Sequence, residues 1–109
     1  MKLPGREGED RAVSFLERNG YRIVERNVRV PGGEIDLICT ERDTIVFVEM
    51  KARSGRRFGS AFSAVDSKKR AKLRALAADY LQIVAPTARA RFDVVALDGT
   101  GIALHRNAF

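Results

Sequence analysis

The 109-residue sequence contains no tryptophan, three prolines, one histidine and one cysteine. The single thiol, Cys39, excludes an internal disulfide and is interpreted as a small buried hydrophobe, and so few cysteine and histidine residues argue against a structural zinc site. The chain also lacks any apolar run near the about 18 residues of a membrane-spanning helix, and it becomes charged directly after Met1. We therefore expect a cytoplasmic protein with neither a signal peptide nor a membrane segment.

Acidic residues are the minority among the charged side chains, with 14 Asp and Glu against 20 Lys and Arg and a net charge of +6 at pH 7. Such an excess favours polyanionic partners, either nucleic acid or an anionic membrane surface. The excess is concentrated, because residues 51–74 contain nine Lys and Arg and one acid, a local charge of +8, whereas the rest of the chain sums to −2. A chain of this length forms one domain, residues 1–109, and the clustering indicates a surface for a nucleic-acid backbone.

The centre of the sequence is a pair of predicted strands. Residues 33–39 and 45–51 are rich in β-branched and aromatic side chains, and the polar residues between them predict a short hairpin loop. If the loop is either the two residues 42–43 or the four residues 41–44, Ile45 lies opposite Thr40 in an antiparallel pair.

In this register two carboxylates face each other. Asp36 lies opposite Glu49, and Glu34 lies opposite Lys51, because antiparallel partners share a face of the sheet. Opposed carboxylates destabilise a sheet unless one is protonated or a cation lies between them. We predict a cation, since carboxylate oxygens suit Mg²⁺ or Mn²⁺ and Lys51 adds a positive charge beside them. Such a set is typical of phosphodiester cleavage.

A plainer interpretation of these strands stays open. The acids and the lysine form a solvated charge ladder if the loop has an odd length or a bulge shifts the register, because Asp36 and Glu49 then lie on opposite faces. Against this, Ile38, Ile45 and Phe47 share the parity of the carboxylates. That face is apolar at one end and charged at the other, which is typical of the rim of a buried sheet.

A helix is predicted over about residues 7–18. Its apolar stripe includes Ala12 and Leu16, and counting three residues back from Ala12 reaches Glu9. We therefore predict that Glu9 faces inward and joins the carboxylate site. The alternative is that Glu9 only complements the helix dipole, which favours acids in the first turn.

A second helix is predicted over about residues 66–84, with an apolar stripe formed by Leu73, Leu76, Ala77, Tyr80, Leu81 and Val84. Its first turns are basic, although a helix N-terminus favours anions. This arrangement suits phosphate docking on the free amides, and the alternative is a solvated basic face. Together with the Gly-, Ser- and Arg-rich segment before the helix, the candidate nucleic-acid-binding residues are Arg53, Arg56, Arg57, Lys68, Lys69, Arg70 and Lys72.

Three further strands complete the pattern. Residues 21–30 precede the carboxylate pair, and residues 90–97 and 101–105 follow the second helix around a turn that begins at Asp98. Asp93, in the fourth strand, is interpreted as an acid that supports either the site or the fold. The predicted order is helix, three strands, helix, two strands, in the α/β class.

This order, with Asp36 on the second strand and with Glu49 and Lys51 on the third, resembles the restriction-endonuclease-like PD-(D/E)XK nuclease fold. More narrowly, the sequence is similar to the YraN-like family of small bacterial proteins, which are regarded as predicted nucleases related to archaeal Holliday-junction resolvases. The similarity covers nearly the whole chain. The motifs that carry it are Gly8-Glu9, residues 26–29, 33–38 and 47–53, Lys69 with Leu73, and residues 91–95.

The resemblance implies an α-β-β-β-α-β-β core, with a mixed central sheet flanked by helices. The metal ligands that it implies are Asp36, Glu49, Glu9 and the backbone carbonyl of Met50. Lys51 would orient or help to deprotonate the attacking water, and Lys69 would contact phosphate. Ile35 stands where the restriction enzymes have proline, as it does in the family.

Three functions stay open at this point. The first is a nuclease that uses Mg²⁺ or Mn²⁺ and cuts DNA rather than RNA, including branched or damaged DNA. The second is a non-catalytic nucleic-acid-binding module that keeps the nuclease fold, and the third is an interaction domain that binds an acidic protein. We expect no membrane partner, and a homodimer would suit a substrate with two-fold symmetry.

Overall fold

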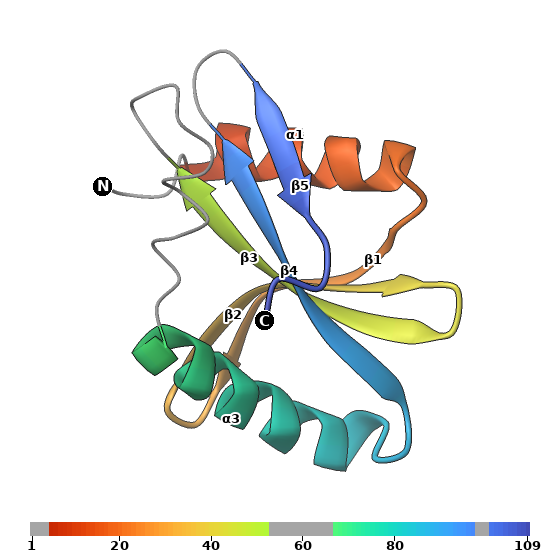
Figure 1. Ribbon diagram of the computed structural model, residues 1–109, viewed down its shortest axis with the longest axis vertical. Coiled ribbons are helices and arrows are strands. Elements are labelled where there is room, and N and C mark those ends of the chain that lie inside the picture. Colours follow the sequence, from red (N-terminus) through yellow and green to blue (C-terminus); the bar gives the residue numbers. More distant parts are fainter. Residues whose placement is uncertain (1–4, 53–66, 98–100) are drawn as a thin grey trace.

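The computed structural model describes residues 5–52, 67–97 and 101–109 (Figure 1). Its elements are α1 (Gly5–Arg18), β1 (Arg22–Val30), β2 (Gly33–Glu41), β3 (Thr44–Ala52), α3 (Ser67–Val84), β4 (Arg89–Leu97) and β5 (Ile102–His105). The order of helix, three strands, helix and two strands is the predicted one. Arg53, Arg56, Arg57 and the turn predicted at Asp98 lie outside the described residues.

The strands form one mixed sheet in the order β1-β2-β3-β4-β5. All neighbouring pairs are antiparallel except β3 and β4, which are parallel. Parallel neighbours need a crossover connection, and α3 lies in the connection between them. The helices α1 and α3 cover opposite faces of the sheet (Figure 1).

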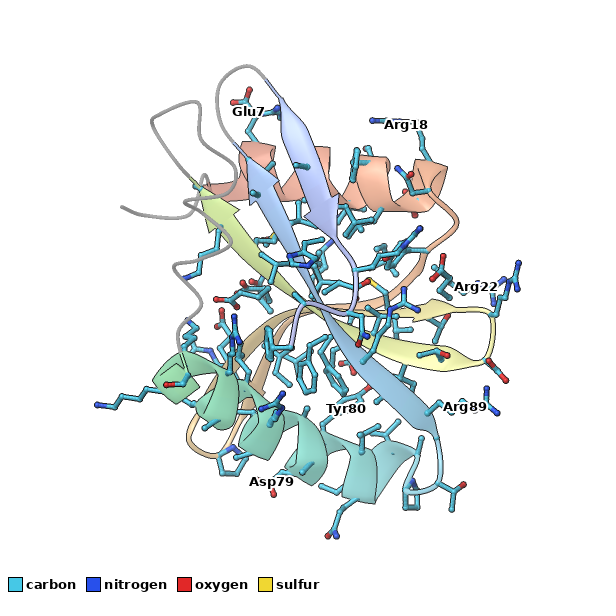
Figure 2. The ribbon with its side chains drawn as sticks, viewed as in Figure 1. Glu7, Arg18, Arg22, Asp79, Tyr80 and Arg89 are labelled. Atoms are coloured by element: carbon cyan, nitrogen blue, oxygen red, sulfur yellow. The ribbon has the colours of Figure 1, made fainter. Side chains whose placement is uncertain are left out.

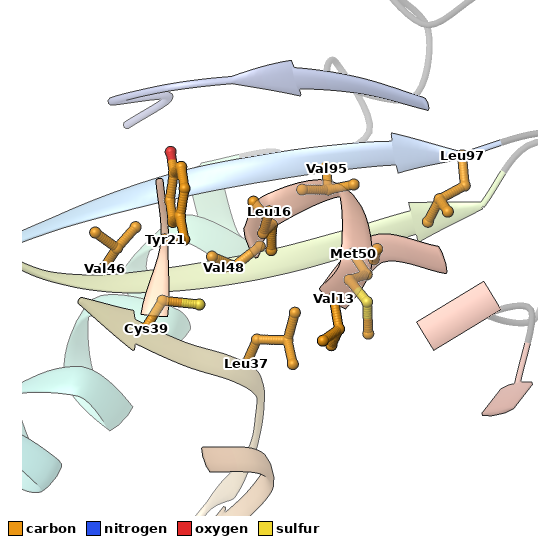
Figure 3. Close-up of a cluster of buried hydrophobic side chains, with 11 residues drawn as sticks. Val13, Leu16, Tyr21, Leu37, Cys39, Val46, Val48, Met50, Val95 and Leu97 are labelled. Carbon is orange, nitrogen blue, oxygen red and sulfur yellow. The ribbon is translucent and has the colours of Figure 1, made fainter. Parts of the chain in front are cut away.

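Two clusters of buried side chains fill the layers between the helices and the sheet. The cluster beneath α1 contains Ala12, Val13, Leu16, Tyr21, Leu37, Cys39, Val46, Val48, Met50, Val95 and Leu97 (Figure 3). The cluster beneath α3 contains Ile35, Ile38, Phe47, Leu73, Leu76, Ala77, Tyr80 and Val94. Cys39 is fully buried, as predicted. Burying one large aliphatic side chain contributes about 1.5–3 kcal/mol, so these clusters hold both helices on the sheet.

The apolar stripe of α3 is confirmed except at its last position. Tyr80 lies on the side of α3 that faces the sheet, whereas Asp79 lies on the outer side (Figure 2). The Tyr80 hydroxyl donates a hydrogen bond to Glu25 of the edge strand β1 at 3.0 Å. Val84, one turn further, is 56% exposed, because the helix has already reached the edge of the sheet at Tyr80.

The β2–β3 hairpin has the predicted register. Thr40 pairs with Ile45, and Arg42 in the two-residue loop has a φ of 56°, as primed hairpin turns require. Ile38 and Phe47 pair and lie on the α3 side, which is the face predicted to carry the carboxylates. Among the helices in the described residues, none is long and apolar enough to cross a membrane.

Candidate active site

The candidate site lies where β2 and β3 stop pairing. The ladder between them ends at the pair Leu37–Val48, one pair short of the predicted pair Asp36–Glu49. At this point the Met50 amide donates a hydrogen bond to Oδ2 of Asp36 at 2.9 Å, so a side chain replaces the carbonyl partner of the ladder. The strands part here because the Asp36 carboxylate takes up the amide.

The two carboxyl groups nevertheless lie together. Asp36 is 8% exposed and Glu49 is 7% exposed. Burial, the negative charge of Glu49 and a hydrogen bond between the two carboxyl groups raise the pKa of Asp36 to about 7, against the smaller opposing effects of the Met50 amide and the Lys69 ammonium. Asp36 is therefore about half protonated near neutral pH in the metal-free protein.

Two lysines contact the same oxygen of Glu49. Lys51 Nζ lies 3.5 Å and Lys69 Nζ lies 3.0 Å from Oε2 of Glu49. Lys51 comes from the same strand two residues further on, as predicted, whereas Lys69 comes from the first turns of α3. The contact between Lys69 and Glu49 was missed by the sequence analysis, although Lys69 precedes the buried Leu73 by four residues and therefore lies on the inward stripe of α3.

A cavity of about 280 Å³ opens beside these groups, lined by Glu34, Asp36, Glu49, Lys69, Lys72, Leu73 and Leu76. The helix α3 thus brings two of its predicted basic residues to the carboxylates. Lys68 is exposed, and the guanidinium of Arg70 lies over the ring of Phe109, 5.6 Å from its centroid. Arg74 lies over the same ring at 5.7 Å.

Glu9 reaches β1 rather than the two carboxylates. Its carboxylate accepts hydrogen bonds from Asn27 Nδ2 at 3.2 and 3.1 Å and from Arg26 at 3.5 Å. Asn27 lies on β1 at the level of Asp36, with a φ of 52°. Within the described residues, no group of three or more His, Cys, Asp and Glu side chains could hold a metal ion. Glu9 is therefore attached to the strand next to Asp36 without completing a three-acid cluster.

Comparison of the sequence with known proteins identifies its family. A family model with the description "Uncharacterised protein family UPF0102" matches residues 8–97. The chain belongs to the UPF0102 family. UPF0102 proteins of Shewanella loihica and Dechloromonas aromatica are 45% and 46% identical to it over 105 residues, which are 96% of this chain and 92% and 87% of theirs. The UPF0102 protein of Moorella thermoacetica is 47% identical over 94 residues, 85% of this chain and 78% of its own.

The region matched by the UPF0102 model contains Glu9, both carboxylates and both lysines of the candidate site. The match over residues 8–97 shows that the chain is a member of the family. Its description names no reaction, so the relation to nucleases stays a prediction.

The donors present in this UPF0102 protein fit Mg²⁺ or Mn²⁺. The amide and the carbonyl of one strand residue leave the strand on the same side, so the Met50 carbonyl faces the side on which its amide meets Asp36. The Met50 side chain points away into the cluster beneath α1. Carboxylate and carbonyl oxygens are the ligands these ions prefer, and Mg²⁺ is commonly held by one or two carboxylates with water in the other positions. Asp36, Glu49 and the Met50 carbonyl would hold it here.

Asp93 is a structural acid in this UPF0102 protein. Its fully buried carboxylate accepts hydrogen bonds from the Tyr21 hydroxyl at 2.5 Å, from Arg91 Nε at 3.0 Å and from the Asn107 amide at 2.8 Å. Arg91 also pairs with Glu41 at 2.6 Å. Of the two interpretations of Asp93, the structure therefore supports the one in which it holds the fold together, by tying the C-terminal residues to β4 and to the start of β1.

Proposed function

We propose that this protein is a Mg²⁺- or Mn²⁺-dependent endonuclease that hydrolyses phosphodiester bonds in nucleic acid. DNA is the proposed substrate, including branched, Holliday-junction-like or damaged DNA, and the cytoplasm is the proposed site of action. The observation that carries the proposal is the pair of buried carboxylates, Asp36 and Glu49, with two ammonium groups held against one of them. A structural role would be met more simply by apolar side chains, since buried charges are costly to maintain.

Each residue of the site has a role in this reaction. Asp36 and Glu49 would bind the divalent cation, which when bound polarises the scissile phosphate and lowers the pKa of a water. Lys51, held beside Glu49, would orient the attacking water and stabilise the negative charge that develops on the phosphate. Attack in line with the leaving 3′ oxygen gives a 5′ phosphate. Glu9, attached to β1 at the level of Asp36, is proposed as a further acid of the metal site.

The basic residues of α3 would bind the nucleic-acid backbone. Lys69 and Lys72 line the cavity beside the carboxylates, and the exposed Lys68 extends the positive charge along the helix. Contacts of this kind go to phosphates and fix the position of the substrate without reading its sequence. Recognition would then rest on charge and shape, and a homodimer would match a substrate with two-fold symmetry.

The test is a cleavage assay with labelled duplex, single-stranded, flap, four-way-junction and RNA substrates, in Mg²⁺ and in Mn²⁺. The variants are Asp36→Asn and Lys51→Ala, and the control is Asp79→Asn, which makes the same change as Asp36→Asn on the outer side of α3. We expect metal-dependent cutting that the control retains and both site variants lose. Cutting that persists in both site variants would come from a contaminant.

A second function is favoured by the charge balance at Glu49. Two lysines already neutralise this buried acid, so the fold needs no metal to tolerate it. A non-catalytic nucleic-acid-binding module would show salt-sensitive binding with no cutting of any substrate. In that case Asp36→Ala leaves the affinity unchanged or raises it, because the change removes negative charge.

A further inference from the structure

Two lysine ammonium groups contact the same carboxylate oxygen of Glu49. Lys51 and Lys69 both reach Oε2 of Glu49, which is 7% exposed, so water has little access to the oxygen that they share. The Lys69 ammonium also acts on Asp36, whose negative charge it favours. Lys69 therefore interacts with both carboxylates proposed to hold the metal, from a position on a different element of the fold.

A divalent cation bound to Oε2 of Glu49 would lie beside two ammonium groups. Three positive charges around one buried carboxylate oxygen repel each other, so binding of the cation favours withdrawal of one ammonium. Lys51 has a 24% exposed side chain and comes from the same strand as Glu49, whereas Lys69 has a 42% exposed side chain at the start of a helix. The cavity of about 280 Å³ that Lys69 lines gives its side chain room to move. Of the two lysines, Lys69 is therefore the one better placed to withdraw.

We infer that Lys69 competes with the divalent cation for Glu49 and is released toward a substrate phosphate when the cation binds. This rests on the proposed function, because it takes Asp36 and Glu49 as metal ligands. Lys69 is thus a positioning residue with two states. Without metal its ammonium neutralises Glu49, and with metal it is available to the nucleic-acid backbone.

This competition couples metal binding to nucleic-acid binding. A bound cation frees one more positive side chain for phosphate, so it raises the affinity for DNA, and DNA must raise the affinity for the cation by the same factor. One additional phosphate contact makes the slope of log affinity against log salt more negative by about 0.9 for duplex DNA. A lysine that only contacted phosphate would give no such dependence on metal.

The first measurement is Mn²⁺ affinity, from the EPR signal of unbound Mn²⁺, for wild type, Lys69→Met and Lys68→Met without nucleic acid. Lys68 is the matched control, because it is the exposed neighbour on the same helix. We expect Lys69→Met to bind Mn²⁺ more tightly by about fivefold or more, in the usual range of site-to-site coupling, and Lys68→Met to match wild type. Weaker or unchanged binding in Lys69→Met would overturn the inference while leaving the metal site intact.

The second measurement uses the wild-type protein and so does not depend on the folding of a variant. Lysine side chains are acylated briefly with and without Mn²⁺, and the modification of each is quantified by mass spectrometry. We expect Mn²⁺ to raise the reactivity of Lys69 severalfold and to leave Lys68 unchanged. Equal reactivity of Lys69 in both conditions, with Mn²⁺ bound, contradicts its release. Absence of Mn²⁺ binding in every protein would instead overturn the metal site, and with it both proposals.

Discussion

Asp36 has an ionisation equilibrium that links the site to the stability of the fold. Its pKa is raised from 3.8 to about 7, mainly by burial and then by the charge of Glu49. Because the folded protein holds a proton that the unfolded chain has lost, this group's contribution to stability is fully present below about pH 4 and disappears as the pH rises through about 7. Each pKa unit corresponds to about 1.4 kcal/mol, so the total loss is a few kcal/mol.

We therefore predict that Asp36→Asn stabilises the protein in EDTA at about pH 8 but has little effect at about pH 4. The amide imitates the protonated acid, since it still accepts from the Met50 amide and does not ionise. Thermal unfolding at both pH values measures the difference, with Asp79→Asn as the control. An equal change in melting temperature at the two pH values would show that the charge of Asp36 has no cost in the folded state.

The position of Glu9 predicts how much it contributes to metal affinity. It is bonded to Asn27 and Arg26 rather than to Asp36 or Glu49, so we predict that Glu9→Gln lowers Mn²⁺ affinity less than Asp36→Asn does. Asp10→Asn is the control, because Asp10 pairs with the same Arg26 at 2.8 Å, whereas it is Glu9 that accepts the hydrogen bonds from Asn27. Mn²⁺ titrations of the three variants settle the order. A loss in Glu9→Gln as large as in Asp36→Asn would mean that Glu9 binds the metal directly.

At the scale of elements, the packing of β2 against α3 holds the lysines at the site. A methyl group added at Gly33 would lie 3.0 Å from Cδ1 of Leu76 and 3.3 Å from Cε of Lys72. Leu76 is buried at 4% exposure and has little freedom to move away. We predict that Gly33→Ala lowers the free energy of unfolding by about 1–3 kcal/mol, as overpacking of a core does.

Urea unfolding measures this effect, and a second substitution identifies its cause. Leu76→Val shortens the contacted side chain, so Gly33→Ala should cost less in the Leu76→Val background than in wild type. Additive effects of the two substitutions would place the cost in the backbone of the turn instead. Measuring the DNA affinity of the same four proteins tests whether the position of Lys72 depends on this contact.

The elements themselves followed from local patterns in the sequence. Alternation placed Ile38 and Phe47 on one face of the hairpin, and the polar loop set the register that pairs Thr40 with Ile45. The residue at which the β2–β3 ladder ends could not be predicted from these patterns. It depends on the Asp36 side chain, which accepts a hydrogen bond from the Met50 amide in place of a backbone carbonyl. Periodicity assigns a face to each residue but not the partner of each backbone group.

At the scale of the whole molecule, the basic excess was predictable and its orientation was not. Composition located nine cations between residues 51 and 74, part of which lies outside the described residues. Which of them meet the carboxylates depends on how α3 sits on the sheet. Lys69 and Lys72 face the site, while Arg70 and Arg74 turn to Phe109, a residue far away in the sequence. Long-range packing of this kind leaves no signal in the local pattern of a helix.

The orientation of α3 predicts how DNA binding depends on salt. Lys72 lines the cavity beside the carboxylates, whereas Arg89 begins β4 and pairs with Thr44, at the opposite end of the parallel pair from Glu49. We predict that Lys72→Gln reduces the salt slope of duplex binding by about one, and that Arg89→Gln leaves it unchanged. Fluorescence anisotropy over a range of salt concentrations, with Ca²⁺ in place of Mg²⁺, measures both slopes.

The two slopes distinguish a localised binding face from a general attraction of a basic protein to a polyanion. If both substitutions change the slope equally, the phosphates are bound over the whole surface, and the cations near the carboxylates have no special part in holding the backbone. If only Lys72→Gln changes it, the backbone crosses the sheet at the end where β2 and β3 part. A scissile phosphate would then lie within reach of Asp36, Glu49 and Lys51, which is the arrangement that hydrolysis requires.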